Sequence, residues 1–334
     1  MGETLNPMLR LAILGMIDGN GHPYSWSAII NGFDPELLKE CPYAAIRDYL
    51  GQQPINEVGI PDARVTHVWT DNTEDAPKVA AMSLIPHVVQ TPVEVIGLVD
   101  AVIIATDDGE DHVRRARPFV EAGLPVFIDK PLATNVPDLR QFIEWEKAGA
   151  RIISSSGMRY APELKGLSSN MPDMGDVRWV SSFSCNSWER YGIHALEALY
   201  PLIRDGVEGI RIEQGQNPKA DIAYIRTCEG IHITIPVCSD AYGSFGAAQI
   251  CGTKTSKSIR LTDTYTAFRG QLLALVAAFR TKTTPCPFSE TVDMMAIIIA
   301  GIRSREEGSR FVLIDEIKKE IQGDDTPRSK HRVI

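Results

Sequence analysis

The sequence predicts an α/β protein in which a doubly wound parallel sheet precedes a second α/β domain with an open, mostly antiparallel sheet. Before residue 160, short apolar runs alternate with helical patterns, which is typical of βαβ units. Several of these runs are apolar without alternation, as expected of strands covered on both faces. After residue 160, apolar and polar residues alternate within the runs, which indicates strands with one outward face. We therefore expect domains at residues 1–157 and 158–334.

Six short apolar runs supply the strands of the first domain. They cover residues 9–14, 65–69, 87–89, 101–105, 126–128 and 152–153. Between them, Thr91-Pro92 and Asn135-Val-Pro are signals for the start of a helix, and an apolar stripe runs from 111 to 123. In a doubly wound sheet, ligands bind at the carboxyl ends of the strands, so the residues that follow each run are the candidates for function.

The clearest alternating run of the second domain is 231–238, where aliphatic residues take every second position. Pro236 lies within this run and predicts an edge position or a bulge, because proline has no N–H to donate to a neighbouring strand. Shorter strands are expected over 177–184, 210–213, 222–227, 246–251 and 259–262. Helices are expected over 265–280 and 289–305, packed on one side of the sheet.

Residues 32–63 form an insertion where a short link from the first helix to the second strand would suffice. Two short helices are expected in it, near 35–39 and 43–49. Two interpretations stay open: the insertion is a lid that shapes access of substrate to the cleft, or it is an elaboration of the surface.

Composition narrows the class of protein. The formal net charge of -9 argues against a nucleic-acid binder, which would carry a basic face. The longest strongly apolar stretch, 294–302, is far shorter than the roughly 20 residues that span a bilayer. The N-terminus does not have the pattern of a secretory signal. The cysteines lie far apart without metal-ligand spacing, which favours reduced thiols and predicts no metal site. We expect a cytoplasmic protein without a membrane partner.

A glycine-rich turn follows the first strand. In Gly15-Met-Ile17-Asp18-Gly19-Asn20-Gly21 the glycines have the spacing G-x-x-x-G-x-G, directly before an expected helix. Glycines there let the backbone approach a pyrophosphate, which then rests on the positive end of the helix. The alternative is an ordinary strand-to-helix turn. The position of this turn in an ordered βαβ series favours a dinucleotide.

Asp71 ends the second strand. An acidic side chain at that place accepts hydrogen bonds from the adenosine ribose and favours NAD, whereas a basic neighbour would favour the phosphate of NADP. The next residue is Asn72, so NAD is the expected cofactor and NADP the less favoured one. The alternative is that Asp71 only forms a turn.

The segment after the fourth strand runs from Thr106 and Asp107 to His112. Because it leaves the carboxyl end of a strand, Thr106 and Asp107 are expected near the cofactor. The alternative is a solvated acidic loop that starts a helix.

Asp129-Lys130-Pro131 directly follows the fifth strand. Lys130 at this edge of the sheet is expected to point into the crevice, where a partly buried ammonium can donate or take a proton. In the second domain, Tyr191, His194 and Glu197 are spaced by three and share one face of a helix. Histidine suits removal of a proton from a hydroxyl, although a lone histidine on a helix is more often structural.

Taken in order, these segments resemble the Gfo/Idh/MocA family of sugar and inositol dehydrogenases over nearly the whole chain. Asp129-Lys130-Pro131-Leu-Ala is similar to that family's Glu-Lys-Pro-Leu-Ala signature. Further matches are Gly157-Met-Arg159-Tyr-Ala-Pro162, Gly192-Ile-His194, the proline-containing segment 283–289 before a helix, and Ser304.

The resemblance implies a Rossmann domain that binds NAD(P) and an α/β domain whose open sheet carries substrate contacts and often oligomer contacts. It implies Lys130 and His194 as catalytic or substrate-orienting groups. We expect Tyr191 to act with His194, and Arg159 is a candidate substrate contact. The residues expected to bind the cofactor are Gly15, Ile17, Asp18, Gly19, Asp71, Thr106, Asp107, His112, Asp129 and Lys130.

Three departures from the family pattern stand out. Ile17 and Asn20 lie where the family usually has glycines, and Arg190 takes the place of an Asp four residues before the histidine. Tyr191 either takes over the polar role of that Asp, or the Asp is not replaced. The segment before His112 is one residue longer than the common form.

The expected reaction is reversible oxidation of a secondary alcohol of a sugar, cyclitol or related polyol, in a dimer or tetramer. Lys130 would polarise the reacting oxygen, and His194 with Tyr191 would move the proton. Two alternatives stay open. One is a glycosidase-like or epimerising cycle with retained NAD, and the other is a ligand-binding regulatory protein that has lost catalysis.

Overall fold

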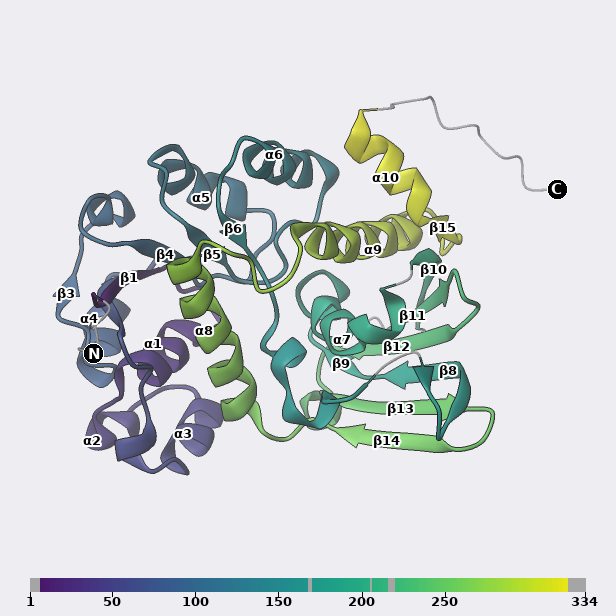
Figure 1. The fold of residues 1–334 in the computed structure, drawn as a ribbon, viewed down its shortest axis with the longest axis horizontal. Coiled ribbons are helices and arrows are strands. Elements are labelled where there is room, and N and C mark those ends of the chain that lie inside the picture. The colour runs from purple at the N-terminus through teal and green to yellow at the C-terminus, as the bar shows by residue number, and fades with distance from the viewer. Residues whose placement is uncertain (1–6, 168–169, 205, 216–219, 324–334) are drawn as a thin grey trace, which may run out of the picture.

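The computed structural model describes residues 7–167, 170–204, 206–215 and 220–323. Residues 1–6, which carry part of the expectation about a secretory signal, lie outside this set. Two sheets lie side by side, one in each half of the chain, with helices packed around and between them (Figure 1). None of the helices in the described ranges is long and apolar enough to cross a membrane.

The first sheet has six parallel strands in the order β3-β2-β1-β4-β5-β6, which confirms the predicted doubly wound sheet. The side chains of its strands are mostly buried and aliphatic, as expected of a sheet covered by helices on both faces. The strand order reverses between β1 and β4, so a crevice opens at the carboxyl ends of these strands. The strands are β1 (Leu9–Leu14), β2 (Ala63–Trp69), β3 (His87–Val88), β4 (Ala101–Ile104), β5 (Val126–Ile128) and β6 (Ile152–Ile153).

The helices of this domain begin where the sequence signals them. Asn135 caps α6 (Val136–Lys147) by accepting a hydrogen bond from the backbone N–H of Asp138. Thr91 begins only a single 3-10 turn, η2 (Pro92–Val95), because the chain leaves the helical conformation at Ile96. The other helices are α1 (His22–Asn31), α4 (Asp75–Met82) and α5 (His112–Glu121).

The insertion folds as the two short helices that the sequence predicts, followed by a 3-10 turn. They are α2 (Pro35–Leu38), α3 (Ala44–Gly51) and η1 (Ile55–Glu57). Leu38, Ile46 and Leu50 are buried in the same core cluster as α1, so the insertion is part of the domain and not a loose loop.

The second sheet is mixed and mostly antiparallel, in the order β14-β13-β8-β12-β11-β10-β15, with parallel pairing only between β12 and both β8 and β9. Short β7 (Asn170–Met171) pairs with β8. The remaining strands are β8 (Gly175–Ser182), β9 (Ser184–Cys185), β10 (Val207–Gln214), β11 (Ala220–Thr227), β12 (His232–Cys238), β13 (Ala247–Gly252), β14 (Ser256–Arg260) and β15 (Val312–Leu313).

Helices α7 (Trp188–Ile203) and α9 (Phe288–Glu306) cover one face of this sheet, and α10 (Ile314–Gln322) closes the top of the domain in Figure 1. The α10 helix and β15 were not predicted, although Ile314 and Ile317 on α10 are buried at helical spacing. Short 3-10 turns η3 (Gly157–Tyr160), η4 (Pro162–Leu164) and η5 (Tyr242–Ser244) complete the domain.

Two predictions about the second domain are wrong. Pro236 lies on central strand β12, not at an edge: it pairs with Ile222 of β11, and on its other side it falls opposite the break at Phe183 between β8 and β9. Helix α8 (Thr264–Thr281) does not pack on the second sheet. Its buried residues Leu272 and Leu275 belong to the Rossmann-domain core, because α7 and α9 already occupy the sheet's inner face.

Candidate active site

A cavity of ≈ 390 Å³ lies where the carboxyl edge of the first sheet meets the second domain. The first domain lines it with residues 19–22, Asp107 and Lys130. The second domain contributes Tyr191 and His194 from α7, and the segment that joins the domains contributes Ser156. The structure thus brings the three predicted catalytic residues, Lys130, His194 and Tyr191, to one cavity.

Lys130 is 3 % exposed, and its ammonium has two partners. Its Nζ lies 3.4 Å from Oδ2 of Asp107 and 4.5 Å from the ring centre of Tyr191. A buried ammonium needs such partners, because removing it from water is costly. The two contacts hold the amine at the wall of the cavity.

Asp107 is the carboxylate that balances this part of the site. Its Oδ1 accepts a hydrogen bond from Arg190, and its Oδ2 faces Lys130. Burial alone would raise the pKa of Asp107, but Lys130 and Arg190 outweigh it and lower the pKa to about 2. The arginine that departs from the family pattern therefore pairs with a carboxylate from the end of β4.

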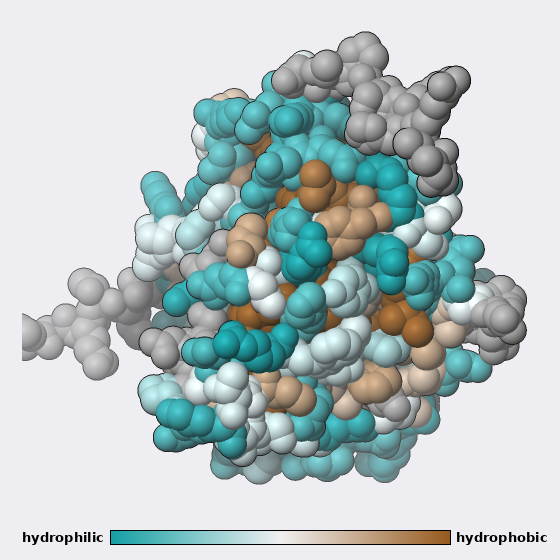
Figure 2. All heavy atoms as spheres, turned by 90° about the vertical axis from the view of Figure 1, so that its right-hand side faces the viewer, coloured by the Kyte–Doolittle hydropathy of each residue, from teal (hydrophilic) through white to brown (hydrophobic). Residues whose placement is uncertain are grey.

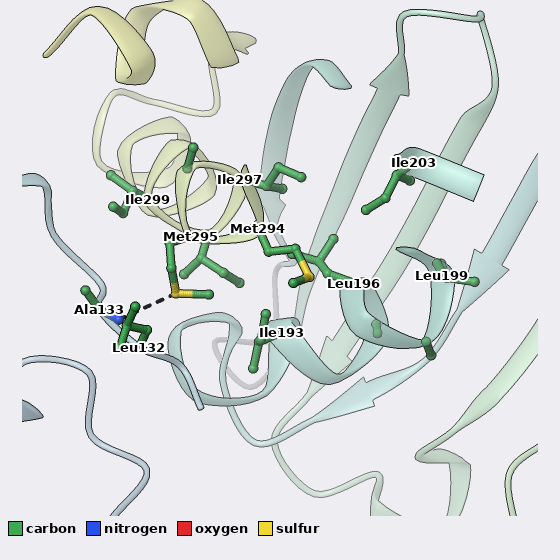
Figure 3. Close-up of a cluster of buried hydrophobic side chains, with 14 of the residues drawn as sticks. Leu132, Ala133, Ile193, Leu196, Leu199, Ile203, Met294, Met295, Ile297 and Ile299 are labelled. Carbon is green, nitrogen blue, oxygen red and sulfur yellow. Dashed lines mark hydrogen bonds between the residues drawn. The ribbon is translucent and has the colours of Figure 1, made fainter. Parts of the chain in front are cut away.

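The segment that carries Lys130 is fixed at both ends. Oδ1 of Asp129 accepts the backbone N–H of Lys130 at 2.7 Å, and the Lys130–Pro131 peptide bond is cis. Leu132 and Ala133 then pack against α7 and α9, and the N–H of Ala133 points to the sulfur of Met295 at 3.5 Å (Figure 3). Lys130 is thus positioned by the core that joins the two domains.

His194 is neutral. Its Nδ1 lies 2.7 Å from Oγ of Ser156, and the ring packs edge-on against Tyr191 and Phe245. Burial, followed by the charge of Lys130, lowers the pKa of His194 well below its usual value. Its Nε2 makes no hydrogen bond to any described residue. An imidazole of this kind can pass a proton on but does not hold it.

A second histidine, His22, lines the same cavity and was not singled out by the sequence analysis. Its Nδ1 lies 2.6 Å from Oδ2 of Asp129, and its ring stacks on Trp26 at 4.1 Å between centres. Asn20 donates to the same Asp129 oxygen at 3.2 Å. Asp129 therefore ties the glycine-rich turn to the lysine segment. A signal was present in the sequence, since Pro23 marks His22 as the first residue of α1.

The glycine-rich turn has features that fit a dinucleotide. Gly15 has φ +90°, and a Cβ there would lie 2.7 Å from Thr106 Cγ2, so β1 and β4 approach too closely for a side chain. The hydroxyl of Thr106 is buried without a hydrogen-bond partner. Helix α1 begins at His22, after Gly21, which has no side chain to cap it; the N–H of His22 is accepted by Oδ1 of Asn20 at 2.9 Å.

Of the remaining cofactor candidates, one lines the cavity and three do not. Gly19 lines the cavity, whereas Ile17 and Asp18 form the turn behind it, where the carbonyl of Ile17 accepts the N–H of Asn20. His112 is fully buried with its ring nitrogens 3.2 and 2.8 Å from the carbonyls of Leu132 and Thr106. His112 therefore supports the loop and does not face the cavity.

Asp71, at the end of β2, is not free in this structure. Its Oδ2 accepts the N–H of Met16 at 3.0 Å, and its carboxylate is bound by two nitrogens of Arg115. Arg115 lies on α5, 44 residues along the chain, so this basic neighbour was invisible in the sequence around Asp71.

Arg159, the candidate substrate contact, is not brought into the cavity. Its guanidinium pairs with Glu197 and, at 2.6 Å, with Glu290, and it lies over the ring of Tyr200. Arg159 is part of η3, and these partners keep its guanidinium outside the cavity. Glu197, although on the same helical face as His194, is 2 % exposed and also serves this internal network.

The insertion reaches the cavity. Tyr43, Ile46 and Tyr49 line it, and the hydroxyl of Tyr49 bonds to Ser25 on α1. A Cβ on Gly21 would lie 2.6 Å from the ring of Tyr43, so the insertion packs directly on the glycine-rich turn. This contact requires glycine at position 21.

Residues 49–156 match the family model described as the Gfo/Idh/MocA oxidoreductase family, NAD-binding Rossmann fold. This match confirms the predicted resemblance and the predicted NAD-binding domain. A curated protein of Amycolatopsis mediterranei, provisionally named a UDP-kanosamine synthase oxidoreductase subunit, is 26% identical over 70 residues. That match spans 21% of this chain and about a fifth (20%) of the relative's length.

Solved structures share the whole fold at low identity. Myo-inositol dehydrogenase from Lactobacillus casei, in complex with NAD(H) and myo-inositol, superposes with a TM-score of 0.71 at 15% identity, covering 92% of this chain and 96% of that one. A probable dehydrogenase from Thermotoga maritima gives 0.70 at 16% identity, covering 92% and 100%. These likenesses confirm the predicted fold class.

Proposed function

We propose that this chain, which belongs to the Gfo/Idh/MocA oxidoreductases through its NAD-binding Rossmann domain, is a dehydrogenase acting on a secondary alcohol of a sugar, cyclitol or related polyol. The observation that carries the proposal is the buried amine of Lys130 in a cavity that also holds Tyr191 and His194. Solved structures with the same fold are named inositol dehydrogenases, which supports a polyol.

Each residue has a role that follows from its surroundings. The ammonium of Lys130, balanced by Asp107, polarises the reacting oxygen and stabilises negative charge on it. Because the imidazolium of His194 is disfavoured, its Nε2 takes the alcohol proton only in passing and releases it to water in the cavity. A bound nicotinamide supplies the carbon that accepts or returns the hydride.

The insertion serves this chemistry as a lid. Tyr43, Ile46 and Tyr49 add an aromatic and aliphatic wall to a cavity that also holds the polar groups of Lys130, Asp107 and His194. Such a wall excludes water from the reacting centre and packs against the apolar face of a sugar ring. We expect Tyr49→Ala to raise KM more than it lowers kcat, since it removes wall area and leaves Lys130 in place.

A cycle that retains the dinucleotide is the second candidate. The packing of Tyr43 on Gly21 favours it, because this contact closes the insertion over the turn expected to hold the pyrophosphate. The two candidates differ in one measurement: a dehydrogenase produces one NADH per turnover, and a retaining enzyme converts substrate without net NADH.

The outer face of the second sheet supports a homo-oligomer. α7 and α9 cover its inner face, whereas Trp179 and Ile222 on the outer face are 44% and 45% exposed. Hydrophobic residues lie between hydrophilic ones on the side of the molecule that carries this sheet (Figure 2). Light scattering of wild type and Ile222→Glu tests this, with a shift to smaller mass expected of the variant. All six cysteines are free thiols, which supports a cytoplasmic setting.

The deciding experiment incubates the full chain with NAD+ and a panel of inositols and sugar alcohols and follows NADH absorbance. Nucleotide binding is measured separately by calorimetry. We expect NAD+ to bind, and at least one polyol to be oxidised by wild type but not by Lys130→Met. Turnover that survives Lys130→Met would show that Lys130 is not the polarising group. A wild type that binds NAD+ but oxidises no polyol would favour a regulatory or binding role for this cavity, and absence of nucleotide binding would refute the proposal.

A further inference from the structure

Arg115 lies at the place where the sheet receives the adenosine end of a dinucleotide. A Cβ on Gly15 would lie 3.2 Å from Nη1 of Arg115 and 3.5 Å from Oδ2 of Asp71. Both side chains therefore lie next to Gly15, the residue that follows β1. The end of β2 is where such sheets hold the ribose hydroxyls, and a carboxylate there favours NAD over NADP.

The negative charge of Asp71 is balanced by the guanidinium of Arg115. Nη2 of Arg115 lies 2.7 Å from Oδ1 of Asp71, and Nη1 lies 3.2 Å from Oδ2, which is the two-pronged geometry that arginine forms with carboxylates. The side chain of Arg115 is 12% exposed, and its guanidinium also binds Asp111 through Nε at 2.5 Å. Asp111 in turn is paired with Arg114. Two carboxylates thus meet two guanidinium groups, and the cluster has no net charge.

Arg115 retains donors for a ligand. Guanidinium has five N–H groups, of which the contacts to Asp71 and Asp111 engage three. A phosphate monoester carries a charge of roughly -1.5 to -2 at neutral pH and is recognised well by such a planar donor array. A free Asp71 would repel that phosphate; a paired Asp71 does not.

We propose that Arg115 makes the ribose site at the end of β2 accept NADP as well as NAD, by neutralising Asp71 and offering its free N–H groups to the 2′-phosphate. The inference rests on the proposed function only in that the chain binds a nicotinamide dinucleotide. The residue that would set the preference between NAD and NADP is then Arg115 on α5, which lies far from Asp71 in the sequence.

The pairing has opposite consequences for the two nucleotides. The ribose hydroxyls of NAD compete with Arg115 for the oxygens of Asp71, whereas the phosphate of NADP gains Arg115 as a partner. Removal of the guanidinium should therefore strengthen or preserve NAD binding and weaken NADP binding. A residue with only a structural role would weaken both.

The test measures dissociation constants of NAD+ and NADP+ by calorimetry on the full chain, without substrate. For wild type we expect the two constants to agree within about tenfold. For Arg115→Gln we expect the NADP+ constant to rise about tenfold or more, as for loss of a charged hydrogen bond, with no rise for NAD+. Arg117→Gln, which makes the same charge change on α5 at a side chain 47% exposed and outside this cluster, is the matched control and should leave the ratio unchanged.

A second variant covers the case in which Arg115→Gln fails to fold. Asp71→Asn keeps the guanidinium and should shift the ratio the other way, towards NADP+. The inference is overturned if wild type prefers NAD+ by about a thousandfold, or if Arg115→Gln weakens both nucleotides equally. If neither nucleotide binds wild type, the proposed function falls as well; strict NAD+ binding would remove the inference alone.

Discussion

The two walls of the cavity, one from the strand ends of the first sheet and one from helix α7, differ in how their buried polar side chains are paired. On the Rossmann side, Lys130, Asp107 and Asp129 are charged, and each is held by an opposite charge or a hydrogen-bond donor. On the α7 side, His194 and Tyr191 are neutral, and His194 has only the hydroxyl of Ser156 as a partner. The difference teaches that the strand ends of the first sheet supply charges of both signs, whereas α7 supplies the neutral His194 and Tyr191 together with the charged Arg190, which pairs with Asp107.

The largest expected effect comes from removing the charged amine. Lys130→Met should lower kcat about 10³-fold, because the reacting oxygen loses its polarising partner. Asp107 stays paired with Arg190 in this variant, so the protein should fold. Steady-state kinetics measure the loss, and Lys78→Met, at an exposed lysine on α4, is the control that should be unaffected. Activity close to wild type would show that the charged wall is not the catalytic one.

The next effect concerns the carboxylate that balances the amine. Asp107→Asn leaves Lys130 and Arg190 as uncompensated neighbours, which should lower kcat about 10²-fold and the free energy of unfolding by about 3 kcal/mol. Urea denaturation and kinetics measure the two losses. Asp108→Asn, at the exposed neighbouring carboxylate, is the matched control. Loss of stability without loss of kcat would make Asp107 a structural residue only.

Asp107 also predicts how stability responds to acid. The pKa of Asp107 in the fold is lowered to about 2, against roughly 3.9 in an unfolded chain, so its stabilising effect is complete above pH 4 and is lost as the pH falls towards 2. In Asp107→Asn this part of the acid dependence should disappear. Unfolding free energies of both proteins between pH 5 and pH 2, as far as they remain folded, test the difference. Parallel curves would contradict it.

Protonation of His194 should destabilise the fold because it adds a buried charge, whereas protonation of Asp107 destabilises the fold because it removes one. Because the pKa of His194 in the fold lies well below that in the unfolded chain, acid protonates the unfolded state first, and the stability due to neutral His194 is lost as the pH falls below about 6.5. His194→Asn should lower kcat about tenfold to a hundredfold and reduce this loss. The dependence of unfolding on pH between 8 and 5 measures it. A loss that is unchanged in the variant would place the titrating group elsewhere.

The smallest expected effect is at Ser156. Ser156→Ala removes the hydroxyl partner of Nδ1 of His194 and should lower kcat only about fivefold to tenfold, the value of one neutral hydrogen bond. Kinetics at pH 8 measure it, and Ser154→Ala, two residues away in the same segment, is the matched control. A loss as large as that of Lys130→Met would mean that the orientation of His194 matters as much as the charge.

Local chemistry explains why much of the fold and part of the site could be predicted from the sequence. The strands of the first sheet are apolar runs bounded by polar turns, and they were placed nearly to the residue, from Leu9–Leu14 to Ile152–Ile153. Lys130 was found because it directly follows such a strand. Alternation in the second domain located β8, β11, β12 and β13 closely, but β10 was predicted at half its length, β14 was shifted, and the two-residue strands β7 and β15 were missed. Pro236 misled because the break between β8 and β9 could not be foreseen.

What the sequence by itself determined is therefore most of the elements and the edge of the sheet on which the candidate site residues lie. Hydrophobic periodicity and turn residues act over a few positions, so a single chain carries this information locally. The tertiary structure alone decided the partners: Arg115 on Asp71, Arg190 on Asp107, His22 on Asp129, and α8 against the Rossmann core. These contacts join residues far apart in the chain, and charge pairing and burial select them only after the elements have packed.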